Sequence, residues 1–110
     1  MAPIATGRAP QAIGPYSQGM AFGSLVLTSG QIPVDPATGE IVGGGIAAQA
    51  EMACKNVGEV LAAGGSSFGQ VIKTTCFIAD MADFQAFNAV YEKYFTGKPA
   101  RSCVAVKALP

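Results

Sequence analysis

A tight turn between two β-forming runs is the feature of this sequence that most restricts its fold. Residues 16–22 and 25–32 are rich in apolar and hydroxyl side chains, and only Gly23 and Ser24 separate them. A two-residue connection with glycine first is typical of a β-hairpin, so we expect two antiparallel strands here. The register then pairs four sets of residues: Phe22 with Leu25, Met20 with Leu27, Gln18 with Ser29, and Tyr16 with Gln31.

The remainder of the chain alternates between helical and β patterns. Apolar residues at helical spacing predict a helix over 46–63, which the left-handed cap Gly64–Gly65 ends. An aromatic stripe predicts a second helix, which Asp80 caps together with Asp83 and which stops at Gly97. Further strands are expected over three segments: a short one near 40–42, and longer ones over 71–79 and within 98–106.

This order of elements, β-β-(β)-α-β-α-β, predicts a single α+β domain over residues 1–110. We expect a mixed β-sheet with two helices packed on one face. The other face of the sheet then lacks a cover, which predicts that several copies of the chain associate. Candidates for the uncovered face are apolar side chains of the hairpin and of the third long strand: Met20, Leu27, and the side that carries Ile72 and Ile78.

Composition excludes several classes of function. The sequence contains no histidine, so it lacks the most common metal ligand and the most common general base at neutral pH. Its net charge is zero and its lysines are scattered, which disfavours binding of nucleic acid through a basic surface. The three cysteines form no CxxC pair and fit neither a disulfide framework nor a zinc site. We expect free thiols, and neither a metal nor a cofactor.

The same features favour a cytoplasmic location. Free thiols are typical of a reducing compartment. The first five residues, Met-Ala-Pro-Ile-Ala, lack the pattern of a signal or transit peptide. No apolar stretch approaches the length of a membrane span, so we expect no membrane partner.

The segment 98–106 places one arginine, Arg101, at the head of an apolar β-branched run. Side chains alternate along a strand, so Arg101 shares one side with Cys103 while Val104 lies on the other. A guanidinium held beside a packed sheet is a planar cationic fork that suits a carboxylate. The alternative is an edge arginine whose charged end extends into water.

Five motifs support the first interpretation. They are Ile13-Gly-Pro-Tyr-Ser-Gln18, Leu27-Thr-Ser-Gly-Gln-Ile-Pro33, Val71-Ile-Lys-Thr-Thr75, Phe87-Asn-Ala-Val-Tyr91 and Pro99-Ala-Arg-Ser-Cys-Val104. In content and order they closely resemble the RidA family, also called the YjgF family, whose older names are endoribonuclease L-PSP and translation inhibitor. The resemblance covers nearly the whole chain. It implies a chorismate-mutase-like α+β fold and a homotrimer with ligand clefts between subunits.

The resemblance also implies an activity and a site. Family members hydrolyse reactive enamines and imines, such as 2-aminoacrylate, to 2-keto acids and ammonia. Arg101 matches the arginine that grips the substrate carboxylate, and Tyr16 and Ser29 match polar groups near the imine or its water. The remaining positions match residues that line the cleft: a backbone contact at Gly30, a wall from a helix at Phe87 and Asn88, and a neighbour of the arginine at Cys103.

One part of the family pattern has no counterpart in this sequence. Relatives continue past the position of Pro110 with one more strand, whose glutamate helps to activate the attacking water. The final strand is therefore expected to be missing from this chain. Two explanations stay open, a piece of a longer protein or a short form that binds ligand or catalyses weakly. An unpaired strand edge would be a liability for a short form.

Two other functions stay open at this stage. The older family names suggest cleavage of single-stranded RNA or inhibition of translation, although the absence of histidine and of a basic-aromatic surface disfavours both. The third candidate is a non-catalytic trimer that binds small carboxylic acids such as 2-keto acids.

Overall fold

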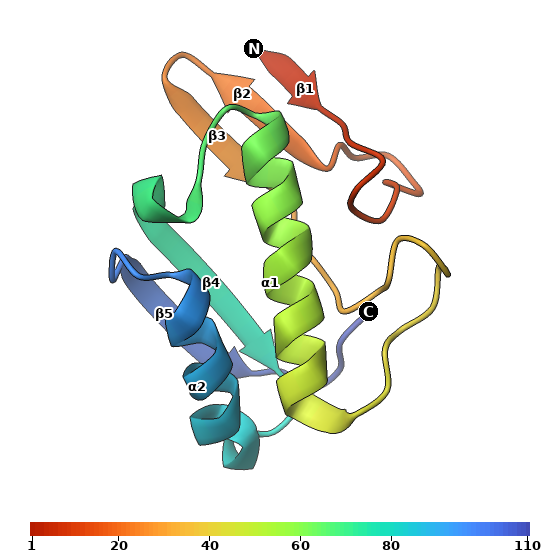
Figure 1. Cartoon of the computed structure of the whole chain (residues 1–110), viewed down its shortest axis with the longest axis vertical. Coiled ribbons are helices and arrows are strands. Elements are labelled where there is room, and N and C mark those ends of the chain that lie inside the picture. The colour runs from red at the N-terminus through yellow and green to blue at the C-terminus, as the bar shows by residue number, and fades with distance from the viewer.

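The computed structural model describes residues 1–110, with two helices in front of the strands (Figure 1). The strands are β1 (Ala2–Ile4), β2 (Gly19–Phe22), β3 (Leu25–Thr28), β4 (Lys73–Ile78) and β5 (Ala100–Ala105). The helices are α1 (Gly45–Ala63) and α2 (Phe84–Tyr94), with single 3-10 turns η1 (Phe68–Gln70) and η2 (Met81–Asp83). The order agrees with the predicted α+β fold, with one additional strand, β1, at the start of the chain.

The predicted hairpin is present as β2 and β3, in the predicted register. Phe22 pairs with Leu25 and Met20 with Leu27. The ladder ends at Gly19 and Thr28, and beyond it one bond continues from the Ser29 amide to the Gln18 carbonyl at 2.8 Å. The predicted pair of Tyr16 with Gln31 does not form part of the ladder, so both strands are shorter than expected.

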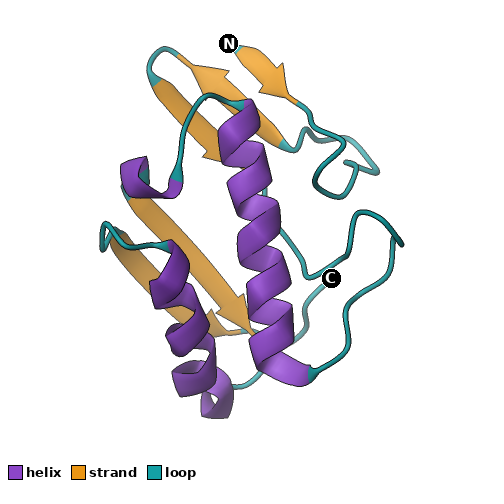
Figure 2. Cartoon of the chain, in the orientation of Figure 1, coloured by secondary structure: helices purple, strands orange, loops and turns teal.

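Strand direction is mixed, as predicted, but the strands form two hydrogen-bonded groups. β1, β2 and β3 form an antiparallel sheet, and β4 and β5 form a parallel pair. α2 makes the crossover that a parallel pair requires. Both helices lie on the same side of the strands (Figure 2). The short strand expected near 40–42 is reduced to one bridge between Val34 and Ile41.

The helix termini follow the predicted signals with small differences. α1 ends at Ala63 with Gly64 as its C-cap, and the left-handed residue is Gly65, with φ of 80°. The Asp80 carboxylate accepts a 2.9 Å hydrogen bond from the Ala82 amide, so it caps η2, and α2 begins directly after that turn. Asp83 makes no side-chain cap, and the predicted capping box is therefore absent.

The core lies between the helices and the strands, in two clusters. Cys54, Cys76, Tyr91 and Phe95 form the cluster beneath α2. Ile4, Ala9 and Val60 form the other beside the hairpin, so β1 contributes a side chain that seals this end of α1. Two buried amides fix loops to this frame: Gln18 donates to the carbonyl of Pro10 at 2.7 Å, and Asn56 donates to those of Ile32 and Val34.

The prediction for the uncovered face is correct for the hairpin and wrong for Ile78 of β4, whereas Ile72, the residue before β4, is 73% exposed. Leu27 is exposed on that face, and Met20 is half-buried opposite it. On β4, however, Ile78 is 3% exposed and faces the helices, whereas Phe77 is 56% exposed. The helices cover the side that carries Cys76 and Ile78, so the bare side is the other one. Phe77 pairs there with Val104 of β5.

Candidate functional site

Arg101 lies on β5, one of the two strands of the parallel pair, and it is half-buried. Alternation along β5 is as predicted: Arg101 and Cys103 are half-buried, whereas Ser102 and Val104 are exposed. The side that carries Arg101 is the side on which α2 packs. The guanidinium therefore does not extend freely into water; α2 determines its surroundings.

Three residues of α2 surround the guanidinium. Arg101 Nη1 donates a 2.6 Å hydrogen bond to Asn88 Oδ1. Its Cζ atom lies over two rings, 4.6 Å from the centroid of Tyr91 and 5.4 Å from that of Phe84. Cation–π attraction holds a guanidinium over a ring face in this way. The arginine is thus fixed by an amide and by aromatic surfaces, without a counter-ion.

No carboxylate of the chain neutralises Arg101. The one ion pair of the chain joins Lys93 to Glu51, 3.5 Å apart, between α2 and α1. Tyr94 also donates to Glu51, and this hydrogen bond is the first cause that lowers the pKa of that carboxyl. Arg101 keeps most of its N–H donors unused, because a guanidinium has five. It can therefore take a carboxylate from a ligand in the bidentate manner.

Two further predicted residues lie near Arg101. The Phe87 ring is 5.9 Å from that of Tyr91, and Cys103 packs with Phe87 against the cluster beneath α2. Cys54 and Cys76 are buried and Cys103 is half-buried, and all three thiols are free. Burial raises the pKa of Cys54 to about 12, so this thiol stays protonated and is a poor nucleophile.

Tyr16, Ser29 and Gly30 form a second group, beside the hairpin. Ser29 Oγ donates to the Ser17 carbonyl at 2.5 Å, and the Tyr16 ring is 54% exposed. A methyl group at Gly30 would meet nothing within 4 Å. No hydrogen bond joins this group to Arg101 or Asn88 within one chain. One copy thus carries two groups of predicted site residues, and the structure does not join them.

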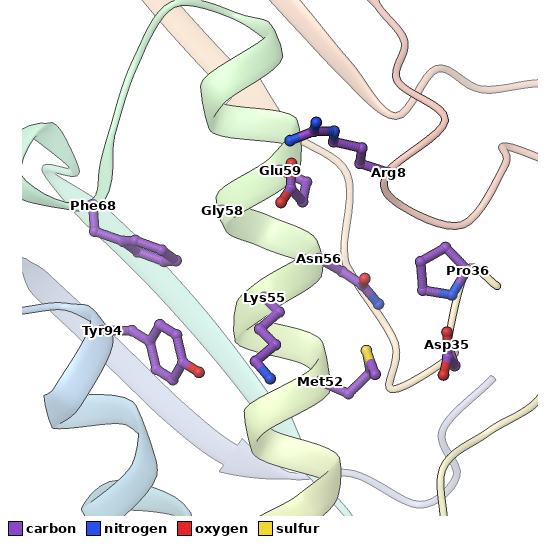
Figure 3. A pocket seen from close by; sticks show the side chains of 10 residues that line it. All are labelled: Arg8, Asp35, Pro36, Met52, Lys55, Asn56, Gly58, Glu59, Phe68 and Tyr94. Carbon is purple, nitrogen blue, oxygen red and sulfur yellow. The ribbon is translucent and has the colours of Figure 1, made fainter.

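One concavity of the chain lies elsewhere. It has a volume of about 590 Å³ and is lined by residues around α1, including Arg8, Asp35, Asn56, Phe68 and Tyr94. In Figure 3 Phe68 and Tyr94 lie on one side of the helix, and Arg8 and Asp35 on the other. None of the predicted site residues lines it. Nor does any group of three acidic, cysteine or histidine side chains lie where it could hold a metal ion.

Sequence reasoning missed Phe84, Tyr91 and Thr74 as neighbours of the site. The aromatic spacing of 84–95 indicated core packing, which is correct for Phe95 but incomplete for Tyr91. Thr74 is the cross-strand partner of Arg101, and its Oγ1 lies 2.6 Å from the Tyr91 hydroxyl. The sequence predicts a strand over 71–79 and a family motif over 71–75, but it assigns no role to Thr74. Tyr91 follows Asn88 by three residues, and residues three apart lie on the same face of a helix. This spacing was the signal that could have placed Tyr91 beside the site.

The model of the endoribonuclease L-PSP family matches residues 6–110. The chain belongs to this family. A Salmonella typhimurium protein named 2-iminobutanoate/2-iminopropanoate deaminase is 51% identical over 111 residues, which cover 97% of this chain and 86% of that protein. A human protein of the same name is 47% identical, with 97% of this chain and 79% of that protein covered.

Solved structures of the family have the same fold. The Escherichia coli YjgF gene product matches with a TM-score of 0.95 and 47% identity, over 100% of this chain and 89% of that one. Escherichia coli TdcF, solved with bound serine, matches with a TM-score of 0.95 and 48% identity, over 100% and 89%. The mixed α+β architecture is therefore the chorismate-mutase-like fold of this family. No helix of the chain has the length and apolar character to cross a membrane.

Proposed function

We infer that this protein is an imine deaminase, which hydrolyses enamine and imine acids of the 2-aminoacrylate type to 2-keto acids and ammonia. The observation that carries this proposal is the half-buried Arg101 guanidinium, fixed by Asn88 and free of any carboxylate of the chain. The names of relatives about half identical to this chain support it. A 2-imino acid brings the carboxylate that Arg101 lacks.

The chemistry requires little beyond orientation. An enamine first tautomerises to the imine, as a proton leaves nitrogen and another is taken up at the β-carbon. The imine carbon is electrophilic, so water adds to it, and the carbon–nitrogen bond of the resulting aminoalcohol then breaks to release ammonia and leave the keto acid. Arg101 would hold the carboxylate while Tyr16 and Ser29 place the water against the imine carbon. Gly30, Phe87, Asn88 and Cys103 would line the cleft. Neither a cofactor nor a metal enters these steps.

The two groups of site residues favour a cleft that forms between copies. The first group lies where β5 meets α2 and consists of Arg101 and Asn88. The second group lies beside the hairpin and consists of Tyr16, Ser29 and Gly30. A homotrimer could bring the first group of one copy against the second group of its neighbour. The bare face of the strands, with Phe77 and Val104 exposed, supplies apolar area for such an assembly. We place this one-domain protein, residues 1–110, in the cytoplasm with the enzymes that release such imines.

The experiment adds purified protein to a serine or threonine dehydratase reaction and follows the release of keto acid. We expect faster release with the wild type, and kcat/KM lower by about 30- to 1,000-fold in Arg101→Ala, because a charged anchor contributes roughly 2–4 kcal/mol to transition-state binding. Lys107→Ala, which removes the same charge from an exposed position nearby, is the control. An unchanged rate with folded wild-type protein would reject the activity, and saturable binding of 2-keto acids without turnover would indicate a binding protein.

The assembly has its own test. Light scattering on the native protein should give three copies, and Phe77→Lys should separate them and abolish activity together. Ile41→Lys, a charge at an exposed apolar residue outside the bare face, should leave both unchanged. An active monomer would contradict a cleft built from two copies.

A further inference from the structure

Tyr91 lies where the parallel strands, helix α2 and the Arg101 guanidinium meet. We propose that Tyr91 is a positioning residue for Arg101: Thr74 fixes its hydroxyl, and its ring face holds the centre of the guanidinium where the group meets a carboxylate. This role rests on the proposed function only for its effect on catalysis. The positioning itself is a property of the chain without ligand.

The register of the parallel pair brings the three residues together. Thr74 and Arg101 are direct partners on β4 and β5, and both are half-buried on the side covered by α2. Tyr91 reaches both of them. Its hydroxyl lies 2.6 Å from Thr74 Oγ1, and its ring centroid lies 4.6 Å from Arg101 Cζ. One side chain of the helix thus joins two adjacent strands.

The Tyr91 ring is itself held in place. Its side chain belongs to the buried cluster and is only 7% exposed. The Phe95 ring stacks on it, with centroids 4.4 Å apart and an interplanar angle of 21°. The hydrogen bond to Thr74 anchors the far end of the ring. A ring restrained at both its face and its tip offers a surface of fixed orientation.

Three side chains of α2 then restrain the guanidinium. Asn88 accepts from Nη1, and Cζ lies over the Tyr91 ring and, farther away, over the Phe84 ring. The hydrogen bond fixes one end of the group, whereas the nearer ring, that of Tyr91, holds its centre by cation–π attraction. The remaining N–H donors therefore face a ligand in one orientation. A carboxylate can then bind with little loss of side-chain entropy at Arg101.

Kinetics of four variants test the role. Tyr91→Leu removes the ring face and should raise KM by about 2- to 30-fold, the range of cation–π energies, with a smaller change in kcat. Tyr91→Phe and Thr74→Val remove only the hydroxyl bond and should raise KM less. Thr74→Ser should restore it. Tyr94→Phe is the matched control. It removes a tyrosine hydroxyl from the same helix, but that hydroxyl donates to Glu51 and has no contact with Arg101.

A readout without ligand separates this role from the activity. The Arg101 Nε–Hε resonance, identified by its absence in Arg101→Lys, should be sharp and shifted by the Tyr91 ring current. The shift should be lost in Tyr91→Leu and kept in Tyr94→Phe. If Tyr91→Leu does not fold, Tyr91→Phe and Thr74→Val replace it in the test. We expect the Arg101 Nε–Hε resonance to be broader in both variants than in the wild type.

The outcomes are distinct. If the wild type turns over no imine but the resonance changes as expected, the proposed function fails and the positioning role stands. If the wild type is active while the Tyr91 and Thr74 variants keep both its KM and its Arg101 resonance, the positioning role is wrong and the activity stands.

Discussion

The amide oxygen of Asn88 accepts a 2.6 Å hydrogen bond from Nη1 of Arg101, and this bond joins helix α2 to the edge strand β5. The Asn88 side chain thereby restrains the arginine without neutralising it. An amide is the group that can do this, since a carboxylate of the same size would form an ion pair.

Asn88→Asp should therefore impair the site while the fold is kept. The new carboxylate would occupy the guanidinium and compete with the carboxylate of a ligand, so we expect KM for imine acids to rise by at least about tenfold. Asn88→Ala loses one hydrogen bond and should raise KM only a few-fold, by roughly 1 kcal/mol. Steady-state kinetics and titration with a benzoate-like acid measure both. Equal affinity in Asn88→Asp and wild type would show that Arg101 does not bind the carboxylate.

Gly30→Ala tests the site at a position that the isolated chain does not constrain. Its backbone has no left-handed φ, and an added methyl group would meet nothing within 4 Å. We expect an unchanged melting temperature but a large loss of kcat/KM, because the methyl group would enter the cleft where the Gly30 backbone meets the ligand. Gly69→Ala, equally open, is the control. Full activity of Gly30→Ala would remove Gly30 from the site.

Gly19→Ala should be costly to stability. A methyl group there would lie 2.8 Å from the Leu27 carbonyl oxygen and 2.9 Å from Val60 Cγ1, so β2 and α1 would have to separate. Overpacking of this kind typically costs about 1–3 kcal/mol. Urea unfolding at neutral pH measures the change, with Gly43→Ala as a control in open space. A loss below about 0.5 kcal/mol, the range of ordinary surface changes, would contradict this packing.

The free energy of unfolding should also fall at alkaline pH because the Cys54 thiol is buried. Burial raises the pKa of Cys54 from 9.0 to about 12, so the folded protein retains a proton that the unfolded chain loses. The stabilisation is complete below pH 9 and is lost as the pH rises towards 12, at up to about 1.4 kcal/mol per pH unit for one proton. Urea unfolding at pH 8, 9 and 10 should show a smaller slope in Cys54→Ala than in Cys103→Ala. Equal slopes would mean that Cys54 does not carry this effect.

The elements that could be predicted from sequence are those with local signals. The glycine-first turn at Gly23 is sufficient to define the register of β2 and β3, and the apolar stripe with its glycine end predicts α1 within one residue at its start. β1 was missed because three residues carry no usable periodicity. It forms only because Ile4 finds a partner strand and a place beside Val60.

Features that depend on long-range packing could not be predicted in the same way. Alternation predicts that Ile72 and Ile78 share a side, but Ile72 lies before β4 and is 73% exposed, whereas the helices cover Ile78. Gln18 reads as a polar strand end, yet it is buried because its amide satisfies backbone groups of residues 6–10. For the site, alternation placed Arg101 and Cys103 together, whereas the roles of Tyr16, Ser29 and Gly30 came from family resemblance and stay predictions.

Asn56 connects the hairpin side of the molecule to α1. Its amide donates hydrogen bonds to the carbonyls of Ile32 and Val34, which links the segment after Gly30 to that helix. α1 also packs on α2, the helix that carries Asn88. Both groups of predicted site residues are thus connected to α1. If a small acid binds between neighbouring copies, both binding surfaces are preorganised, so the chain would lose little conformational entropy on binding.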